Sequence, residues 1–176
     1  MILGAVLAGG LSTRFGSDKA LAELDGRTLL ARAVDSLAGW CDHVVVVGRP
    51  AAPAPTLPDW PRPGMGPLGG LAAALRYAAD EGYATVLSIA VDSLVLPEDL
   101  PKLLSPAPAC LRSQPVVGHW PSSAAEIVET ILRGEQPHSM QRFVRTVGAA
   151  MVEMADPPAN VNTPADLAAL RGAQPE

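Results

Sequence analysis

The sequence has few of the residues on which zinc modules and disulfide-stabilised domains depend. Its 176 residues include two cysteines and three histidines. Neither Cys41 nor Cys110 stands at a short spacing from the other or from a histidine, whereas zinc ligands usually come in such groups. We therefore expect two reduced, buried thiols rather than a metal centre or a disulfide framework.

Long apolar runs and a surplus of positive charge are also missing. No run approaches the roughly eighteen apolar residues that cross a bilayer, and no basic segment precedes the first apolar stretch. The formal net charge is -5, which argues against a broad nucleic-acid surface. We therefore expect a cytoplasmic protein that binds neither nucleic acid nor membrane.

The apolar residues that are present follow an alternation of strand and helix signals. Runs at 2–7, 44–47 and 84–91 have the length and composition of strands buried on both faces, and helical periodicity separates them. This alternation predicts an α/β fold, Rossmann-like, with three α/β/α layers around a mostly parallel central sheet. The chain length suits a single domain over residues 1–176.

Several local signals predict where elements begin or cannot form. Thr28 is suited to cap a helix, Ser123 has an acid three residues later as in a capping box, and 163–166 reads as a third helix start. The weaker pattern over 115–120 indicates an edge strand. The segment 50–63 contains six prolines, so it predicts a loop rather than a helix or an inner strand.

The stretch from Leu3 to Lys19, LGAVLAGGLSTRFGSDK, joins an apolar strand to a loop rich in glycine and serine. Gly9, Gly10 and Gly16 have no Cβ, so their backbone N–H groups can lie close to a polyanion. At the carboxyl end of a parallel strand, such a loop predicts a site for the phosphates of a nucleotide.

The spacing within this loop fits neither of two common phosphate motifs. This loop matches neither the dinucleotide-binding pattern G-x-G-x-x-G nor the Walker pattern G-x-x-x-x-G-K-S/T. Five residues separate Gly10 from Gly16, and Lys19 stands three residues after Gly16. The pattern that remains is L-A-G-G-x-S-x-R-x-G-x-D-K. It combines bare backbone amides with two cations, Arg14 and Lys19.

Residues 7–19 resemble the signature loop of the nucleoside-triphosphate transferase superfamily, and the Gly-Gly pair is most similar to the molybdenum cofactor guanylyltransferases. The resemblance implies a nucleotidyltransferase domain that moves GMP from GTP to molybdopterin, with Mg²⁺ as cofactor. Relatives that attach cytidine usually read Ala-Ala-Gly there, so guanosine is favoured. The implied nucleotide-binding residues of this loop are Leu7, Ala8, Gly9, Gly10 and Lys19, with Arg14 and Lys19 catalytic.

Asp92 ends the apolar run VLSIAVD, where a strand leaves the core. A carboxylate there can hold Mg²⁺ between phosphates, and by geometry alone it can equally cap the strand end before the next helix. The resemblance favours the metal, because this position matches the family's metal-binding Asp, which also contacts nucleotide and serves catalysis. Relatives usually read Asp-x-Pro, whereas Asp92-Ser93-Leu94 has no proline.

Asp59 and Gly66 form a second candidate group. A carboxylate can accept the guanine N1–H and N2–H pair, which adenine cannot offer, although Asp59 in a proline-rich loop can also be a solvated turn residue. The family places an acid seven residues before its Gly-Pro-Leu, and Asp59 stands seven before Gly66, so the resemblance implies that both bind nucleotide. Relatives often carry Asn near Gly48, at the end of the second strand.

Asn160 and Asn162 precede the last predicted helix in the sequence Asn-Val-Asn-Thr-Pro. Asparagines at such a place can be pure turn residues. The stretch also resembles a family motif that faces the acceptor and the metal, and alternate side chains of an extended segment share one face. On this resemblance we expect both asparagines to bind the acceptor.

The resemblance implies GTP and molybdopterin as small-molecule substrates, and a monomer in transient contact with molybdoenzyme apoproteins or chaperones. Two other functions stay open. One is a related transferase with another nucleotide or acceptor, such as a molybdopterin cytidylyltransferase; the other is a non-catalytic protein that binds a nucleotide or cofactor. Gly48 and the missing proline leave the latter open, while Arg14, Lys19 and Asp92 weigh against it.

Overall fold

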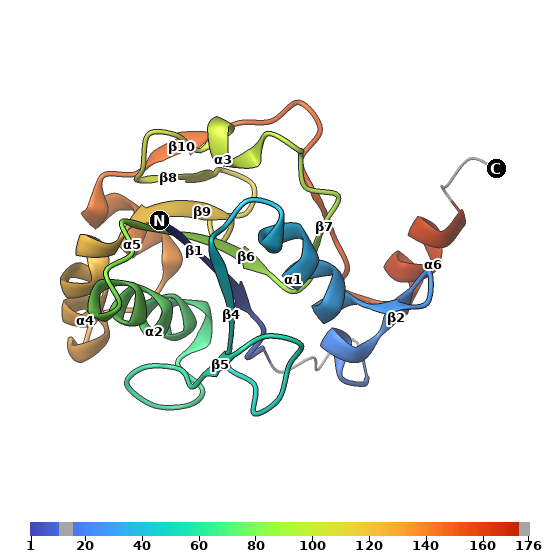
Figure 1. Ribbon diagram of the computed structural model, residues 1–176, viewed down its shortest axis with the longest axis horizontal. Helices are drawn as coiled ribbons and strands as arrows, with labels where there is room; N and C mark the ends of the chain where they lie inside the picture. The colour runs from blue at the N-terminus through green and yellow to red at the C-terminus, as the bar shows by residue number, and fades with distance from the viewer. Residues whose placement is uncertain (11–15, 173–176) are drawn as a thin grey trace.

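A mixed sheet forms the centre of the computed structural model, which describes residues 1–10 and 16–172 (Figure 1). Every neighbouring pair of strands is parallel except the two pairs made by β9, which runs antiparallel to both neighbours. In this part of the chain the sheet has seven strands, in the order β10 (Ala150–Val152), β8 (Ala109–Leu111), β9 (Gly118–Pro121), β6 (Thr85–Ala90), β1 (Ile2–Leu7), β4 (His43–Val47) and β5 (Thr56–Leu57).

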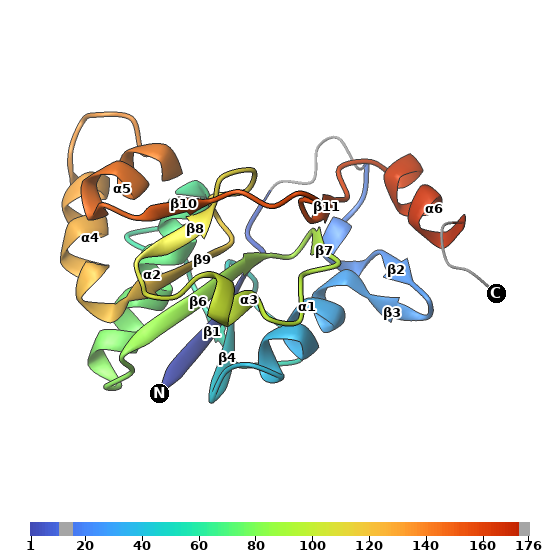
Figure 2. The ribbon, with the colours of Figure 1, turned by 90° about the horizontal axis from the view of Figure 1, so that it is seen from above.

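Helices cover both faces of the sheet, so the predicted three-layer α/β fold is confirmed (Figures 1 and 2). Alternate side chains of β1 enter two separate apolar cores, Leu3 and Ala5 on one face and Val6 on the other. The first core contains α2 (Gly66–Asp80), α4 (Ala125–Arg133) and α5 (Met140–Val147); the second contains α1 (Leu29–Ala38), α3 (Leu100–Leu103) and part of α6 (Pro164–Gly172).

Two of the three predicted helix starts are confirmed. The Thr28 hydroxyl accepts a hydrogen bond from the Ala31 N–H at 3.1 Å, and Thr163 and Asp166 exchange side-chain to backbone bonds at the start of α6. The Ser123 capping box is wrong. A 3-10 turn over Ser122–Ala124 continues from β9, so Ala124 occupies the N-cap of α4 and no side chain caps it.

A strand does form close to the predicted segment 115–120, but the prediction that it lies at the edge of the sheet is wrong. It forms β9, but β8 and β10 extend the sheet beyond it, with Ala109 opposite His119 and Ala150 opposite Ala109. Those two strands have three residues each, too few to give a clear periodic signal. The proline-rich segment contains only β5, at the other edge of the sheet, as its composition predicts.

The sheet register brings the ends of three strands together. Leu7, the last residue of β1, lies opposite Val47 of β4 on one side and Ala90 of β6 on the other. The chain moves from β1 to β4 and then returns to the far side of β1 to form β6, so strand order reverses at β1. Ligands bind at such switch points in open α/β sheets.

Smaller elements surround this carboxyl edge. Antiparallel pairs join β2 (Glu23–Leu24) to β3 (Arg27–Thr28), and β7 (Ser93–Leu94) to β11 (Ala159–Asn160); a 3-10 helix, η1, covers Lys19–Leu21.

None of the helices within residues 1–10 and 16–172 has both the length and the apolar character to span a bilayer.

Candidate active site

A cleft of about 580 Å³ opens at the carboxyl ends of β1, β4 and β6. The residues that sequence analysis assigned to the nucleotide come from five separate segments, and the fold brings them all to its walls. They are Leu7, Ala8, Gly9, Gly10, Lys19, Asp59, Gly66 and Asp92. Arg14, the remaining catalytic candidate, lies outside the described residues.

One wall is shaped by two glycine backbones in contact. Gly48 follows β4 with φ of +87°, and a Cβ placed on it would lie 2.5 Å from the Cα of Gly9. No side chain fits at this position unless the backbone moves. An asparagine at position 48 would therefore be incompatible with this local backbone.

Asp59 lies against these two glycines. A Cβ on Gly9 would lie 3.4 Å from both carboxylate oxygens, and one on Gly48 would lie 3.2 Å from Oδ1. Partial burial raises the pKa of Asp59 above its ordinary value, and a hydrogen bond from the Gly64 backbone offsets part of that rise. The carboxylate is therefore partly buried and lines the cleft.

An ion pair joins this wall to the opposite one. Lys19 Nζ lies 2.7 Å from Asp92 Oδ2, with only 16% and 18% of the two side chains exposed. Asp92 caps no described helix, because α3 begins at Leu100 with Asp99 at its N-cap position. The strand end therefore presents its carboxylate to the cleft and to Lys19.

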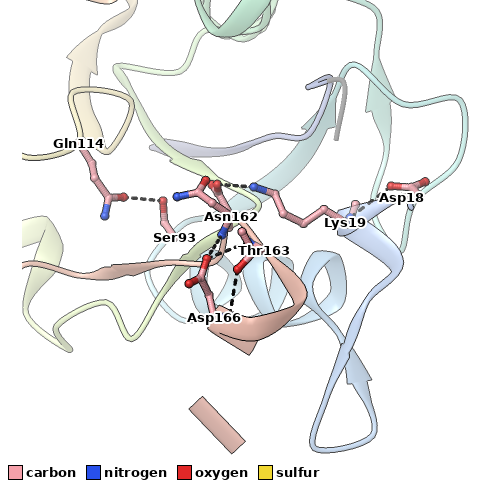
Figure 3. A network of polar contacts seen from close by, with 9 residues as sticks. Asp18, Lys19, Ser93, Gln114, Asn162, Thr163 and Asp166 are labelled. Atoms are coloured by element: carbon pink, nitrogen blue, oxygen red, sulfur yellow. Dashed lines mark hydrogen bonds and ion pairs between the residues drawn. The ribbon is translucent and has the colours of Figure 1, made fainter. Parts of the chain in front are cut away.

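The two asparagines lie differently. Asn160 lines the cleft and pairs with Ser93 across the short ribbon of β7 and β11. Asn162 is not among the described lining residues; its backbone N–H donates to Asp166 Oδ2 at 2.9 Å, beside the start of α6 (Figure 3). The pKa of Asp166 is lowered by the hydrogen bonds from Asn162 and Thr163, with a smaller contribution from the charge of Lys19.

Comparison with known proteins assigns the chain to a family. Residues 4–154 match the model of the MobA-like NTP transferase domain. The chain belongs to this family. A molybdenum cofactor guanylyltransferase from Acidiphilium cryptum is 39% identical to it, over 92% of this chain and 90% of that relative. The resemblance stated from the signature loop is therefore confirmed.

Solved structures agree with the fold. Molybdopterin-guanine dinucleotide biosynthesis protein A from Archaeoglobus fulgidus superposes with a TM-score of 0.75 at 18% identity, covering 98% of this chain and 97% of that one. A Mycobacterium tuberculosis protein, solved in complex with manganese, gives a TM-score of 0.66 at 16% identity, covering 98% and 99%. At these identities the likeness concerns the fold alone.

Sequence reasoning missed Arg49, a residue that contacts Asp18 near the end of the signature loop of this MobA-like chain. Arg49 binds Asp18 with two hydrogen bonds, Nη1–Oδ1 at 2.9 Å and Nη2–Oδ2 at 2.5 Å. This bond to Arg49 lowers the pKa of Asp18, whose Oδ1 also accepts from the Ala20 N–H that opens η1. The sequence does contain a signal for this contact, because a basic residue directly follows Gly48 at the end of β4.

A second missed group lines the same cleft as Asn160. Gln114, in the turn between β8 and β9, lines the cleft and is 7% exposed, and residues 138–141 at the start of α5 line it too. The Oε1 of Gln114 accepts from the Ser93 hydroxyl at 3.0 Å. No motif of the sequence marks Gln114, because its contacts are with segments distant along the chain.

The donor set at Asp92 fits Mg²⁺ better than a soft metal. Mg²⁺ prefers oxygen ligands and is commonly bound by one or two carboxylates together with substrate phosphates. Within the described ranges, no group of three or more His, Cys, Asp or Glu side chains could hold a metal by itself. The site therefore suits a cation that is shared with a nucleotide.

Proposed function

We propose that the protein transfers GMP from GTP to the terminal phosphate of molybdopterin and releases pyrophosphate. The observation that carries the proposal is the Lys19–Asp92 ion pair at the switch point of the sheet, inside a cleft that also contains Gly9, Gly10 and Asp59. The guanylyltransferase names of relatives such as the Acidiphilium cryptum protein support the same reaction.

The proposed chemistry requires positioning and charge neutralisation rather than a protein nucleophile. A phosphate monoester is already largely ionised near neutral pH, so the acceptor can attack the α-phosphorus in line. The backbone N–H groups of Gly9 and Gly10, with Arg14, hold the triphosphate. Lys19 stabilises the negative charge that grows on the α-phosphate and bridging oxygens.

Asp92 is the proposed protein ligand of Mg²⁺. When bound, Mg²⁺ supplies further neutralisation of phosphate charge. Before the ligands bind, Asp92 also holds Lys19 in the cleft through their 2.7 Å contact.

Base selection is proposed to come from the wall of Asp59 and Gly66. The Asp59 carboxylate accepts the N1–H and N2–H donors of guanine, and backbone groups near Gly66 contact the purine edge. Asn160, which lines the opposite side of the cleft, is the proposed acceptor contact, with Asn162 beside it in sequence.

We propose that residues 1–176 act as one nucleotidyltransferase domain, since the two apolar cores share a single sheet. GTP and molybdopterin are its proposed substrates. We also propose that the protein works as a monomer in the cytoplasm, in transient contact with the apoproteins or chaperones that receive the finished cofactor.

Pyrophosphate release, measured with each nucleoside triphosphate, molybdopterin and Mg²⁺, tests the reaction. We expect release only with GTP, only with molybdopterin and only with a divalent cation. Asp92→Asn should weaken the Mg²⁺-dependent release while retaining the fold. Release with CTP in place of GTP would identify a cytidylyltransferase, and nucleotide binding without release would identify a non-catalytic protein.

A further inference from the structure

Gln114 connects the two short strands that carry the acceptor side of the cleft. Its Oε1 accepts from the Ser93 hydroxyl at 3.0 Å, and its Nε2 donates to the Pro158 carbonyl at 2.6 Å. Ser93 directly follows Asp92, and Pro158 stands two residues before Asn160. One amide therefore joins the metal-side segment to the acceptor-side segment; its bond to Ser93 is drawn in Figure 3.

Besides this amide, the two segments are joined by a backbone bond from the Val161 N–H to the Asp92 carbonyl at 3.4 Å and by the burial of Leu94 and Val161 in the second core. The β7 and β11 ribbon has two residue pairs, Leu94 with Ala159 and Ser93 with Asn160. So short a ribbon adds few ladder hydrogen bonds of its own, and the contacts around it contribute to its register. Immediately beyond β7, Val95 has φ of +58° with 77% of its surface exposed, so its own packing contributes little to stabilising this unfavourable backbone.

Gln114 itself is firmly placed. It sits in a tight turn, where its N–H donates to the Leu111 carbonyl at 3.3 Å and its carbonyl accepts from the Val117 N–H at 2.9 Å. Its side chain is 7% exposed and that of Ser93 is 4% exposed. Both hydrogen bonds are therefore shielded from water, and loss of the amide would leave a buried hydroxyl and a carbonyl without this partner.

The chemistry of the contact requires an amide. The partner on one side is a hydroxyl that donates, and the partner on the other is a proline carbonyl that can only accept. A carboxylate would face the Pro158 carbonyl with a second acceptor.

We propose that Gln114 is a positioning residue that sets the distance between Asp92 and Asn160 across the cleft. The inference rests on the proposed function, in which Asp92 holds the cation and Asn160 contacts the acceptor. Groups that orient a metal ligand typically change metal affinity or activity by about 10–100-fold when removed. Gln114 acts through Ser93 and the β7 and β11 ribbon, without itself entering the reaction.

The test compares Gln114→Met, which has similar length but forms neither bond, with Thr85→Val. Thr85 bonds His119 Nε2 at 2.8 Å between strands β6 and β9, at the end of β6 remote from the cleft. Binding of Mn²⁺ is followed by electron paramagnetic resonance in the presence of GTP, alongside metal-free GTP binding and thermal unfolding. These readouts do not depend on turnover.

Gln114→Met should bind Mn²⁺ about tenfold more weakly, while metal-free GTP binding stays at the wild-type value. Thr85→Val should lower the melting temperature and leave Mn²⁺ affinity unchanged. Ser93→Ala, which removes one of the two bonds, should give an intermediate loss and provides the measurement if Gln114→Met does not fold.

The inference is overturned if the variants bind Mn²⁺ as wild type does, if Thr85→Val weakens Mn²⁺ binding as much, or if wild type binds no Mn²⁺ with GTP. Failure of the proposed function has a different signature. In that case wild type binds Mn²⁺ and GTP but forms no guanylated product, and the comparison of the variants still decides the role of Gln114.

Discussion

The two walls of the cleft are built in different ways. The nucleotide wall is fixed by backbone contact, since Gly9 and Gly48 are so close that no Cβ fits between them. The acceptor wall is fixed by side-chain hydrogen bonds, because Gln114 joins Ser93 to Pro158. The first wall is therefore intolerant of added atoms, whereas the second is intolerant of changed polarity.

Lys19 links the walls, so its removal gives the largest expected effect on activity. Lys19→Ala should lower the turnover number about a hundredfold or more, since one preorganised charge at a transition state contributes roughly 3 kcal/mol. Steady-state pyrophosphate release measures this. The chain has one other lysine, the exposed Lys102, and Lys102→Ala is the matched control that should retain wild-type turnover. Near-normal turnover of folded Lys19→Ala would disprove the role.

The backbone contact of the nucleotide wall can be broken at Gly48. Gly48→Ala should lower the free energy of unfolding by roughly 3 kcal/mol, the sum of an unfavourable positive φ and overpacking against Gly9. Gly82→Ala is the control, because Gly82 has φ of +79° with no atom near its would-be Cβ. Denaturant titration measures both, and equal losses would mean that the contact with Gly9 contributes nothing.

Asp59 tests the chemistry of the same wall. Asp59→Asn should reduce the preference for GTP over ATP by roughly 2 kcal/mol, about thirtyfold, because an NH₂ would face a guanine donor. Competition between the two nucleotides in the transfer assay measures the preference. An equal change for both would show that Asp59 shapes the loop rather than reading the base.

The raised pKa of Asp59 adds a prediction on stability. The pKa of Asp59 is higher in the folded than in the unfolded state, so the folded state favours the neutral carboxyl. The stability that this neutral form contributes is lost as pH rises through the folded-state pKa. At neutral pH the charged, partly desolvated form is destabilising, and Asp59→Asn should raise the melting temperature of the nucleotide-free protein. A lower melting temperature at pH 7 would contradict this account.

The smallest effect is expected at His119, away from both walls. Burial lowers the pKa of His119, while its bond to the Leu104 carbonyl partly opposes this. The unfolded chain therefore binds a proton more readily, so stability falls as pH drops below about 6.5, the ordinary pKa of histidine. His119→Gln should flatten the melting temperature between pH 7 and 5, and an unchanged profile would exclude His119 as its source.

The layers of the fold and the nucleotide wall of the cleft could be predicted from the sequence. The acceptor wall, which contains Gln114, could not. The strand of residues 2–7 and the Thr28 cap depend on neighbours close in the chain, so their signals are local. The placement of β9 inside the sheet depends on β8 and β10, two three-residue strands that become recognisable only when paired.

The same distinction separates the functional residues. Gly9, Asp59 and Asp92 stand beside motifs that can be read directly, and all three line the cleft. Arg49 and Gln114 could not be identified in this way, since their partners lie 31, 21 and 44 residues away. Their importance comes from tertiary contacts that a spacing pattern does not contain.

The Lys19–Asp92 pair has a consequence for how two ligands would share the site. Each charge already has a partner of opposite sign, so either ligand arriving alone would have to separate the pair. A triphosphate can receive the ammonium while a divalent cation receives the carboxylate, and together they replace one ion pair with two. The affinities should therefore be thermodynamically linked, with GTP strengthening cation binding by the same factor as the cation strengthens GTP binding.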